Sequence, residues 1–471
     1  MRARDVVYLA LAFAVVLAWT LARPAVGHHG EAREGLVVRD IVEEGRWVLP
    51  RRLGEVPSKP PFFHWLAAAG AHAFGLSDVV LRLPSGVAAF VMATTTLALG
   101  VEVAGPVAGW LAVGALCGMS PFWESASVAR VDMVFSAAVT AALAGFFVWF
   151  RRGGRLARAA CWLGAAAAVL AKGPVGAALV GGVVVVFLGS RRELARLRAL
   201  WSWPLAATAA LVAFGWYALA WLQGGSDFVG RQLVYENLDR FLGRHEFGEH
   251  RRKHDQLRLV VAFAAQLLPW NLALVDAARR WRRGERDDDA GRFLHVWWIV
   301  VLGLFSLSAG KRNVYILPLY PAVALLAGRA LARAVAARPA LRVPAAVARL
   351  APGRPALALA AASVLAWDAA VVVATQVARE LKETRGSLAP FADRVHAAVP
   401  PTAPLVVRRN VAVTDVLVLA YRLGRPIERA RTCTAPGWLV LKAGAADGAA
   451  PVVRSRRKRG DPLALVRCPP G

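Results

Sequence analysis

Acidic residues are scarce in this chain of 471 residues, which holds 31 aspartates and glutamates against 58 lysines and arginines. On a soluble protein, the net charge of +27 would suggest a nucleic-acid partner. Here most basic residues stand in short clusters between long apolar runs, as in the cytoplasmic loops of membrane proteins. Such clusters attract anionic headgroups, so we expect membrane lipids and no nucleic acid as partners.

Cysteine is also scarce, and its spacing excludes the common cysteine-based metal sites. Only four cysteines are present. Cys117 and Cys161 lie in apolar runs, so we interpret them as small core residues. Cys433 and Cys468 share the C-terminal segment and could form one disulfide in an oxidising compartment. The chain also lacks a phosphate-cradling glycine motif, so we expect no nucleotide site.

Apolar runs, several of them long enough to cross a bilayer, recur along the chain, in which 57% of residues are hydrophobic. A membrane-spanning helix needs roughly 20 residues, and we predict about eleven spans. The first, residues 6–21, resembles a signal peptide without a convincing cleavage site, and we interpret it as an uncleaved span with a cytoplasmic N-terminus. The other predicted spans are residues 84–103, 106–119, 133–150, 156–171, 174–188, 204–222, 257–275, 293–308, 314–331 and 355–373.

The positions of four arginine-rich loops test the predicted order of spans. With a cytoplasmic N-terminus, the cytoplasmic loops include residues 151–158, 191–198, 279–286 and 329–349, and each adjoins a span end. The positive-inside rule predicts this placement, and one missed span would invert every later loop. The agreement therefore supports the number of spans and the orientation together.

The remaining long segments then fall on the outer side of the membrane. We predict a membrane domain at residues 1–375, with outer loops at 24–83 and 223–256, and a small soluble periplasmic domain at 376–471. Strand-like runs in that last domain are residues 404–407, 411–419 and 438–441. The predicted fold class is an all-α polytopic membrane helical bundle with a small C-terminal α/β domain.

Charged residues gather at the predicted outer ends of the spans, where charge is costly unless it is paired or functional. Glu31 and Asp132 supply carboxylates, and cations such as Lys59 accompany them. A cation would stabilise a leaving phosphate, and a carboxylate would take a proton from an incoming hydroxyl or amine. The pattern predicts a site for a phosphate substrate with a lipid tail. The alternatives are structural: ion pairs within the loops and interfacial anchoring.

The order of these pieces resembles the GT-C superfamily of glycosyltransferases that use polyprenyl-phosphate sugars, closest to the branch of aminoarabinose lipid A transferases and protein O-mannosyltransferases. The resemblance covers most of the chain up to about residue 333. Each motif alone is weak, but their order and spacing together are fairly specific. The matching pieces are Glu31-Ala32-Arg33, Lys59-Pro60-Pro61, Arg82-Leu83-Pro84-Ser85, Asp132, Lys172-Gly173-Pro174, Glu236-Asn237, Arg240-Phe241, and Lys311 with Tyr315 and Pro318.

Two positions depart from the pattern of this family. The family usually has Asp before the first Glu, where this chain has Gly30, so the base is either Glu31 or Asp132. The family often has Glu, a possible metal ligand, before Lys-Pro-Pro, where this chain has Ser58. We therefore assign no certain cofactor and leave a divalent metal open.

The resemblance implies an inverting transfer of a sugar from an undecaprenyl- or other polyprenyl-phosphate donor to a lipid A-like acceptor, at the periplasmic face of a bacterial inner membrane. Alternatives are a protein acceptor and a non-enzymatic lipid-binding or transport paralogue. The residues that it points to form three groups. The catalytic, phosphate-binding and substrate-binding candidates are, in that order, Glu31 and Asp132; Lys59, Arg82, Lys311 and Arg312; and Arg33, Glu236, Asn237, Arg240, His250 and Tyr315.

Overall fold

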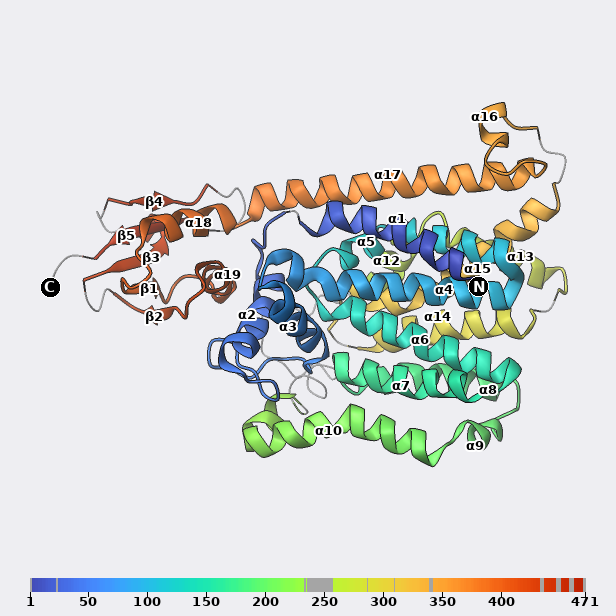
Figure 1. Cartoon of the computed structure of the whole chain (residues 1–471), viewed down its shortest axis with the longest axis horizontal. Coiled ribbons are helices and arrows are strands. Elements are labelled where there is room, and N and C mark those ends of the chain that lie inside the picture. The colour runs from blue at the N-terminus through green and yellow to red at the C-terminus, as the bar shows by residue number, and fades with distance from the viewer. Residues whose placement is uncertain are drawn as a thin grey trace.

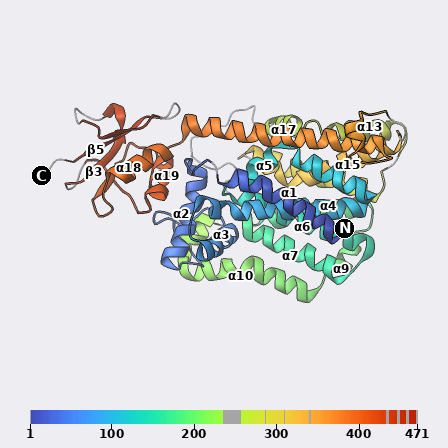
Figure 2. The same ribbon diagram turned by 45° about the horizontal axis from the view of Figure 1, so that its top comes forward.

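Most of the chain forms a long bundle of helices, with a small mixed domain beyond one end, in a computed structural model (Figure 1). A second view shows the same arrangement, with helix α17 (Pro355–Gly386) running along one side of the bundle (Figure 2). The structure describes residues 2–22, 24–232, 234, 257–285, 287–308, 310–338, 342–432, 436–445, 450–456 and 461–468.

Seven helices of the described residues are long and apolar enough to cross a membrane. They are α1 (Ala3–Leu21), α4 (Asp78–Cys117), α6 (Val131–Arg152), α10 (Trp203–Phe228), α14 (Asp289–Leu307), α15 (Tyr320–Ala336) with the 3-10 helix η3 (Asn313–Leu319) before it, and α17. Other predicted spans are α7 (Arg155–Lys172) and the shorter apolar helix α8 (Val175–Ser190). The predicted span at residues 257–275 is divided between α12 (Arg258–Gln266) and α13 (Leu272–Arg282).

Helix α4 accounts for two predicted spans, because it consists of two helices joined by a sharp turn. Ala104 and Gly105 have non-helical backbone angles, and Gly105 has a φ of 84°, which favours glycine. A Cβ on Gly100 would lie 2.6 Å from the Cα of Gly109, so the two halves of α4 pack side by side. The prediction of a multi-pass helical membrane protein is confirmed, while the number of eleven spans stays a prediction.

Arginine-rich turns and the C-terminal domain lie at opposite ends of the bundle (Figure 1). The turn between α6 and α7, the short helix α9 (Arg196–Leu200) and the helix α16 (Ala345–Ala348) mark what we call the arginine end. The other end, which we call the domain end, carries α2 (His29–Glu44) and α3 (Phe62–Phe74) beside the C-terminal domain. The arginine-rich turns between spans therefore gather at one end of the bundle, as the positive-inside rule predicts for cytoplasmic loops.

Helices α6 and α7 approach each other with their backbones in contact. A Cβ on Gly145 would lie 2.7 Å from the backbone nitrogen of Cys161, and one on Gly164 would lie 2.8 Å from that of Ala142. Small residues permit such close packing in membrane bundles. Because the two helices are antiparallel neighbours, the start of α6 and the end of α7 meet at the domain end.

Three of the helices at the domain end begin with an acidic residue in the first turn. Glu31 stands in the first turn of α2, Asp78 in that of α4 and Asp132 in that of α6. The positive end of the helix dipole favours carboxylates at these places. The last turn of α6, at the arginine end, instead carries Arg151 and Arg152, as the opposite pole requires.

The C-terminal domain is a five-stranded mixed sheet with helices, so the predicted α/β domain is confirmed. Its strands are β1 (Leu405–Arg408), β2 (Glu428–Ala430), β3 (Trp438–Lys442), β4 (Val453–Arg454) and β5 (Leu463–Arg467), in the order β2-β1-β3-β5-β4. β1 is parallel to β2 and β3, while β5 is antiparallel to β3 and β4. The helices α18 (Ala389–Ala398) and α19 (Val413–Leu423) connect this sheet to the bundle.

The strand predicted at residues 411–419 is wrong, because this segment forms most of α19. A continuous apolar run fits a buried strand or a buried helix equally well. The run ends at Gly424, whose φ of 68° gives the left-handed cap that commonly terminates a helix. The predicted boundary between residues 375 and 376 falls inside α17, which continues to Gly386.

The four cysteines fall into two groups. Cys117 and Cys161 are buried free thiols, as expected of core residues. Cys468 is disulfide-bonded and buried in the core of the sheet. Cys433, its predicted partner, lies outside the described residues.

Candidate active site

Five segments of the domain end bring the predicted residues together. The first turns of α2 and α6 supply Glu31 and Asp132, the second turn of α4 supplies Arg82, and the end of α7 supplies Lys172. The end of α17 adds Arg379. These side chains form two groups, each centred on one buried carboxylate.

The first group, which we call the Glu31 cluster, consists of Glu31, Arg82, Arg379 and the backbone N–H of Ala129. Arg82 donates from Nε to Glu31 Oε1 at 2.7 Å and from Nη2 to Oε2 at 2.8 Å, a bidentate pair. The Ala129 N–H donates to Oε1 at 2.9 Å, and Arg379 Nη2 lies 3.8 Å from Oε2. Both oxygens of Glu31 are therefore already engaged.

The Glu31 cluster holds its carboxylate ionised. Burial alone would raise the pKa of Glu31, but the guanidinium of Arg82, with Arg379 and the Ala129 N–H, keeps this pKa below its usual range. Arg82 also donates from Nη1 to the carbonyl of Leu21 at 2.9 Å, and its side chain is fully buried. All three nitrogens of Arg82 thus serve protein acceptors, which leaves it badly placed for the phosphate contact predicted from the sequence.

The second group, which we call the Asp132 cluster, consists of Asp132, Arg130, Lys172 and Tyr315. Lys172 Nζ lies 2.6 Å from Asp132 Oδ1, and Arg130 Nε lies 3.2 Å from Oδ2. The ammonium of Lys172 also stands 4.5 Å from the ring centroid of Tyr315, a cation–π contact. The side chain of Arg130 is 30% exposed, so solvent reaches one of the two cations on Asp132.

Further positive charge surrounds these clusters. Lys59 acts electrostatically on Asp132. Burial lowers the pKa of His29, and the positive charges of Arg33, Arg130 and Arg312 lower it further, so this imidazole stays neutral near pH 7. The field at the start of α2 is therefore strongly positive and suits an anionic ligand.

A third buried carboxylate, Glu34, was not predicted from the sequence. Its Oε1 accepts from Arg33 Nε at 3.0 Å, and its Oε2 lies 2.8 Å from His64 Nε2 on α3. Burial alone would raise the pKa of Glu34, yet Arg33 and His64 hold it well below its usual range. The Glu34–His64 pair holds α2 against α3. Arg33 is already bound to Glu34, so the substrate contact predicted for Arg33 would compete with this structural contact.

The other predicted residues differ in where they lie. Lys311 Nζ donates to the carbonyl of Ser308 at 2.8 Å, within its own turn. The positive charge of Arg312 lowers the pKa of His29 at the start of α2, and the ring of Tyr315 contacts the ammonium of Lys172. Four predicted residues lie outside the described part of the chain: Glu236, Asn237, Arg240 and His250.

Three residues belong to the two clusters without having been singled out as site residues from the sequence: Arg130, Lys172 and Arg379. The separate pair of Glu34 with His64 was not predicted either. Lys172 had a signal, because it opens the Lys-Gly-Pro turn. Arg379 had a weaker one, a charge near the end of an apolar helix. Glu34 and His64 had no signal beyond their residue types.

The first departure from the family pattern, Gly30, can be located. A Cβ on Gly30 would stand 3.5 Å from Arg130 Nη1, so the missing side chain would have faced a cation of the Asp132 cluster. Among the residues that the structure describes, no group of three or more His, Cys, Asp or Glu side chains is placed to hold a metal ion. A divalent metal at this site stays a prediction.

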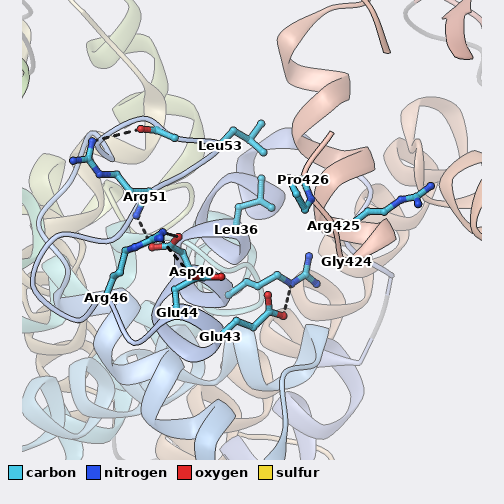
Figure 3. A pocket seen from close by; sticks show the side chains of 12 residues that line it. Leu36, Asp40, Glu43, Glu44, Arg46, Arg51, Leu53, Gly424, Arg425 and Pro426 are labelled. Atoms are coloured by element: carbon cyan, nitrogen blue, oxygen red, sulfur yellow. Dashed lines mark hydrogen bonds and ion pairs between the residues drawn. The ribbon is translucent and has the colours of Figure 1, made fainter. Parts of the chain in front are cut away.

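A cavity of about 510 Å³ lies away from this chemistry, at the far end of α2 beside the C-terminal domain (Figure 3). Its walls carry both signs of charge, and the pairs are closed: Arg46 Nη1 lies 2.6 Å from Asp40 Oδ1, and Arg39 Nε lies 3.4 Å from Glu43 Oε1. None of the predicted site residues lines it. We place the candidate active site at the two carboxylate clusters, because charge and burial converge there.

Comparisons with known proteins agree with the fold. No protein-family model matches the chain. It is 28% identical over 344 residues to the undecaprenyl phosphate-alpha-4-amino-4-deoxy-L-arabinose arabinosyl transferase of Pseudomonas savastanoi pv. phaseolicola, covering 70% of this chain and 62% of that protein. The protein of the same name from Pseudomonas aeruginosa PAO1 is 29% identical over 343 residues, with 69% and 59% covered. The chain thus spans less than two thirds of the length of these relatives.

Solved structures match over nearly the whole chain. ArnT from Cupriavidus metallidurans bound to undecaprenyl phosphate superposes with a TM-score of 0.78 at 19% identity, covering 99% of this chain and 98% of that one. The Archaeoglobus fulgidus oligosaccharyltransferase reaches 0.53 at 12% identity, covering 90% and 64%. The resemblance to GT-C membrane glycosyltransferases is therefore confirmed at the level of the fold.

Proposed function

We propose that this chain transfers a sugar from a polyprenyl-phosphate donor to a lipid acceptor, at the non-cytoplasmic face of a bacterial inner membrane. The observation that carries the proposal is the Asp132 cluster, a buried carboxylate with two cations at one end of a membrane bundle. The names of the curated relatives and the undecaprenyl phosphate in the ArnT structure support the donor class.

The cations of the Asp132 cluster would hold the phosphate of the donor. Lys172 and Arg130 are on Asp132, and Lys59 acts on the same carboxylate. A phosphate diester or monoester carries one or two charges and several acceptor oxygens, so it can compete with a single carboxylate for these N–H groups. Arg312, the residue before η3, adds positive charge that acts on His29 at the start of α2.

Asp132 would act as the base. An oxygen or nitrogen of the acceptor attacks the anomeric carbon of the sugar, the bond from that carbon to the phosphate oxygen breaks, and polyprenyl phosphate leaves with the electron pair. The proton of the acceptor passes to Asp132, whose cations are by then shared with the phosphate. Attack opposite the leaving group inverts the anomeric configuration.

Glu31 would position the site and take no proton. Its carboxylate already accepts three hydrogen bonds, two of them from the buried Arg82. Protonation would break charge-assisted bonds inside the protein and leave Arg82 buried without its counter-charge, which is costly. Of the two carboxylates left open by the sequence, we therefore assign the base to Asp132.

The orientation follows from the arginine end. The turns there would face the cytoplasm, which places the N-terminus inside and the C-terminal domain in the periplasm. The site at the domain end would then face the periplasm, where a lipid A-like acceptor is exposed.

Mass spectrometry of lipids tests the proposal directly. In cells that lack the protein we expect one polyprenyl-phosphate sugar to accumulate and one modified glycolipid to disappear, and the wild-type gene should reverse both. Lys172→Met should fail to reverse them, because the donor phosphate loses a cation. Lys442→Met is the matched control, since Lys442 is a half-exposed lysine of the C-terminal domain paired with Asp461.

Three other results would contradict the proposal in different ways. Loss of a modified protein with an unchanged glycolipid fraction would move the acceptor to protein. Binding of the donor by purified protein without turnover would leave a lipid-binding or transport protein. Full reversal by Lys172→Met would remove the Asp132 cluster from the chemistry.

A further inference from the structure

The C-terminal domain is joined to the bundle at Asp78, the first residue of α4. The Tyr421 hydroxyl on α19 donates to Asp78 Oδ1 at 2.9 Å, and Arg422 Nη1 lies 3.4 Å from Oδ2. The backbone N–H of Val26, in the segment that leads into α2, donates to the same Oδ2 at 2.9 Å. One carboxylate thus holds α19, α4 and the approach to α2 together.

This joint lies one helical turn from the Glu31 cluster. Asp78 and Arg82 are four residues apart on α4, so their side chains share one face of the helix. Arg82 is the residue that clamps Glu31. A shift of the start of α4 would therefore move the guanidinium that orients Glu31.

A second contact fixes α2 itself. A Cβ on Gly35 would lie 2.4 Å from Tyr421 Cε2 and 3.0 Å from Leu81 Cδ2, so the ring of Tyr421 occupies the place of a side chain. Gly35 follows Glu31 by one turn of α2. One turn further, Arg39 stands 5.3 Å from the centroid of the Tyr421 ring and donates to the carbonyl of Ala420 at 3.2 Å.

The joint is anchored inside the C-terminal domain. Arg422 Nη2 also lies 2.6 Å from Asp393 Oδ1 on α18, so Arg422, the residue next to Tyr421, is bound to a second helix of the C-terminal domain. Burial, together with the neighbouring carboxylate of Asp78, raises the pKa of Tyr421. The hydroxyl therefore keeps its proton and stays a donor to Asp78.

We infer that the C-terminal domain sets the geometry of the active site, with Tyr421 as a positioning residue that places α2 against α4 through Gly35 and Asp78. The inference rests on the proposed function and deepens it, because it makes the Glu31–Arg82 pair depend on a domain that supplies no side chain to either carboxylate cluster. Removal of the Tyr421 contacts should alter turnover more than donor binding, since the cations on Asp132 belong to other helices.

The kinetic test uses the full-length protein, with undecaprenyl phosphate as the binding probe. Tyr421→Phe keeps the ring on Gly35 and removes one hydrogen bond, and we expect kcat to fall about fivefold with the Kd for undecaprenyl phosphate and the Tm unchanged. Gly35→Ala should lower kcat further, because its methyl group meets the ring. Gly181→Ala is the control: this helical glycine has open space at its Cβ position, so kcat should stay the same.

A structural readout keeps the inference testable whatever the activity. Spin labels at Glu43→Cys on α2 and Val87→Cys on α4, both exposed positions, report the distance between the two helices. This distance should change in Gly35→Ala and in Tyr421→Ala and stay fixed in Gly181→Ala. An unchanged distance, or full kcat in Tyr421→Phe and Gly35→Ala, would overturn the inference, whereas a wild-type protein without transfer would overturn only the proposed function.

Discussion

The two buried carboxylates at the domain end are held in opposite ways. Glu31 is bound on both oxygens by a fully buried arginine and by a backbone N–H, with Arg379 behind them. Asp132 has one cation on each oxygen, and the side chain of Arg130 is 30% exposed. The first carboxylate is enclosed by buried groups, while one of the two cations on the second, Arg130, is open to an arriving anion.

The difference in how the two carboxylates are held favours a structural role for Glu31 and the proposed catalytic role for Asp132. A buried ion pair with every hydrogen bond made is costly to open, so it fixes the positions of the helices that carry it. A carboxylate whose cations can turn to a phosphate changes its surroundings each time the donor binds. Equal residue type and equal burial therefore do not imply equal roles, and variants of the two clusters should fail in different ways.

The largest expected effect is on turnover at Asp132. Asp132→Asn removes the base but keeps the shape, so we expect transfer to fall by about 10²–10⁴-fold, with a smaller loss of Tm than in Glu31→Gln because Arg130 is partly exposed. Glu31→Gln should lower the Tm and transfer together, because Arg82 loses a charged partner. Turnover assays and thermal unfolding of both purified variants check the contrast, and it is lost if Glu31→Gln folds normally while Asp132→Asn stays active.

Arg82 should give the largest effect on stability. Arg82→Met leaves Glu31 as a buried carboxylate without its bidentate partner, and breaking such a pair typically costs about 3–5 kcal/mol. Unfolding in detergent measures this loss. Arg130→Met is the comparison variant, since its solvent-reachable guanidinium should contribute little to stability while its loss weakens donor binding. Equal losses in the two variants would erase the distinction between the clusters.

The smallest expected effect is on the pH dependence of stability at the start of α2. The pKa values of His28 and His29 lie below 6.5 in the folded protein, so protonation favours unfolding and stability falls as the pH drops below 6.5. The pKa values of Glu31 and Glu34 lie below 4.5, so their contribution is complete above pH 4.5 and is lost as the pH falls further.

A thermal midpoint recorded from pH 7.5 to pH 4 should therefore fall in two stages. The variant His28→Asn/His29→Asn should remove the first stage, which we expect to be a few degrees, and leave the second. A single transition in the wild type, or a first stage that persists in the double variant, would show that other groups govern the acid response.

The sequence predicted the bundle well because its signal is thermodynamic and local. A run of apolar residues long enough for a bilayer becomes a helix wherever it lies, and even the two halves of α4 were visible on either side of residues 104 and 105. Residues 411–419 failed because the same apolar run fits a buried strand and a buried helix, and only the packing of α19 on α2 decides between them.

The sequence singled out several residues that lie together at the domain end, but it did not show how they pair. Asp132 and Lys172 open and close an antiparallel helix pair, so topology alone brings them to one end. The partnership of Glu31 with Arg82 and Arg379 depends on how α2, α4 and α17 are seated, which no local pattern encodes. For this reason Arg82 looked like a phosphate ligand in the sequence, whereas its nitrogens serve Glu31 and Leu21 in the structure.

The position of Arg379 near the end of α17 has a consequence for how the protein folds during its synthesis. Ribosomes make α2 and α4 long before α17, so Glu31 can meet Arg82 early but meets Arg379 only when that late helix has been inserted. The same guanidinium donates to the carbonyl of Thr20, at the end of α1, at 3.3 Å, so this hydrogen bond also forms only after α17 has been inserted. A nascent chain halted before α17 would therefore hold an unfinished catalytic centre, and activity would begin only once translation has passed this helix.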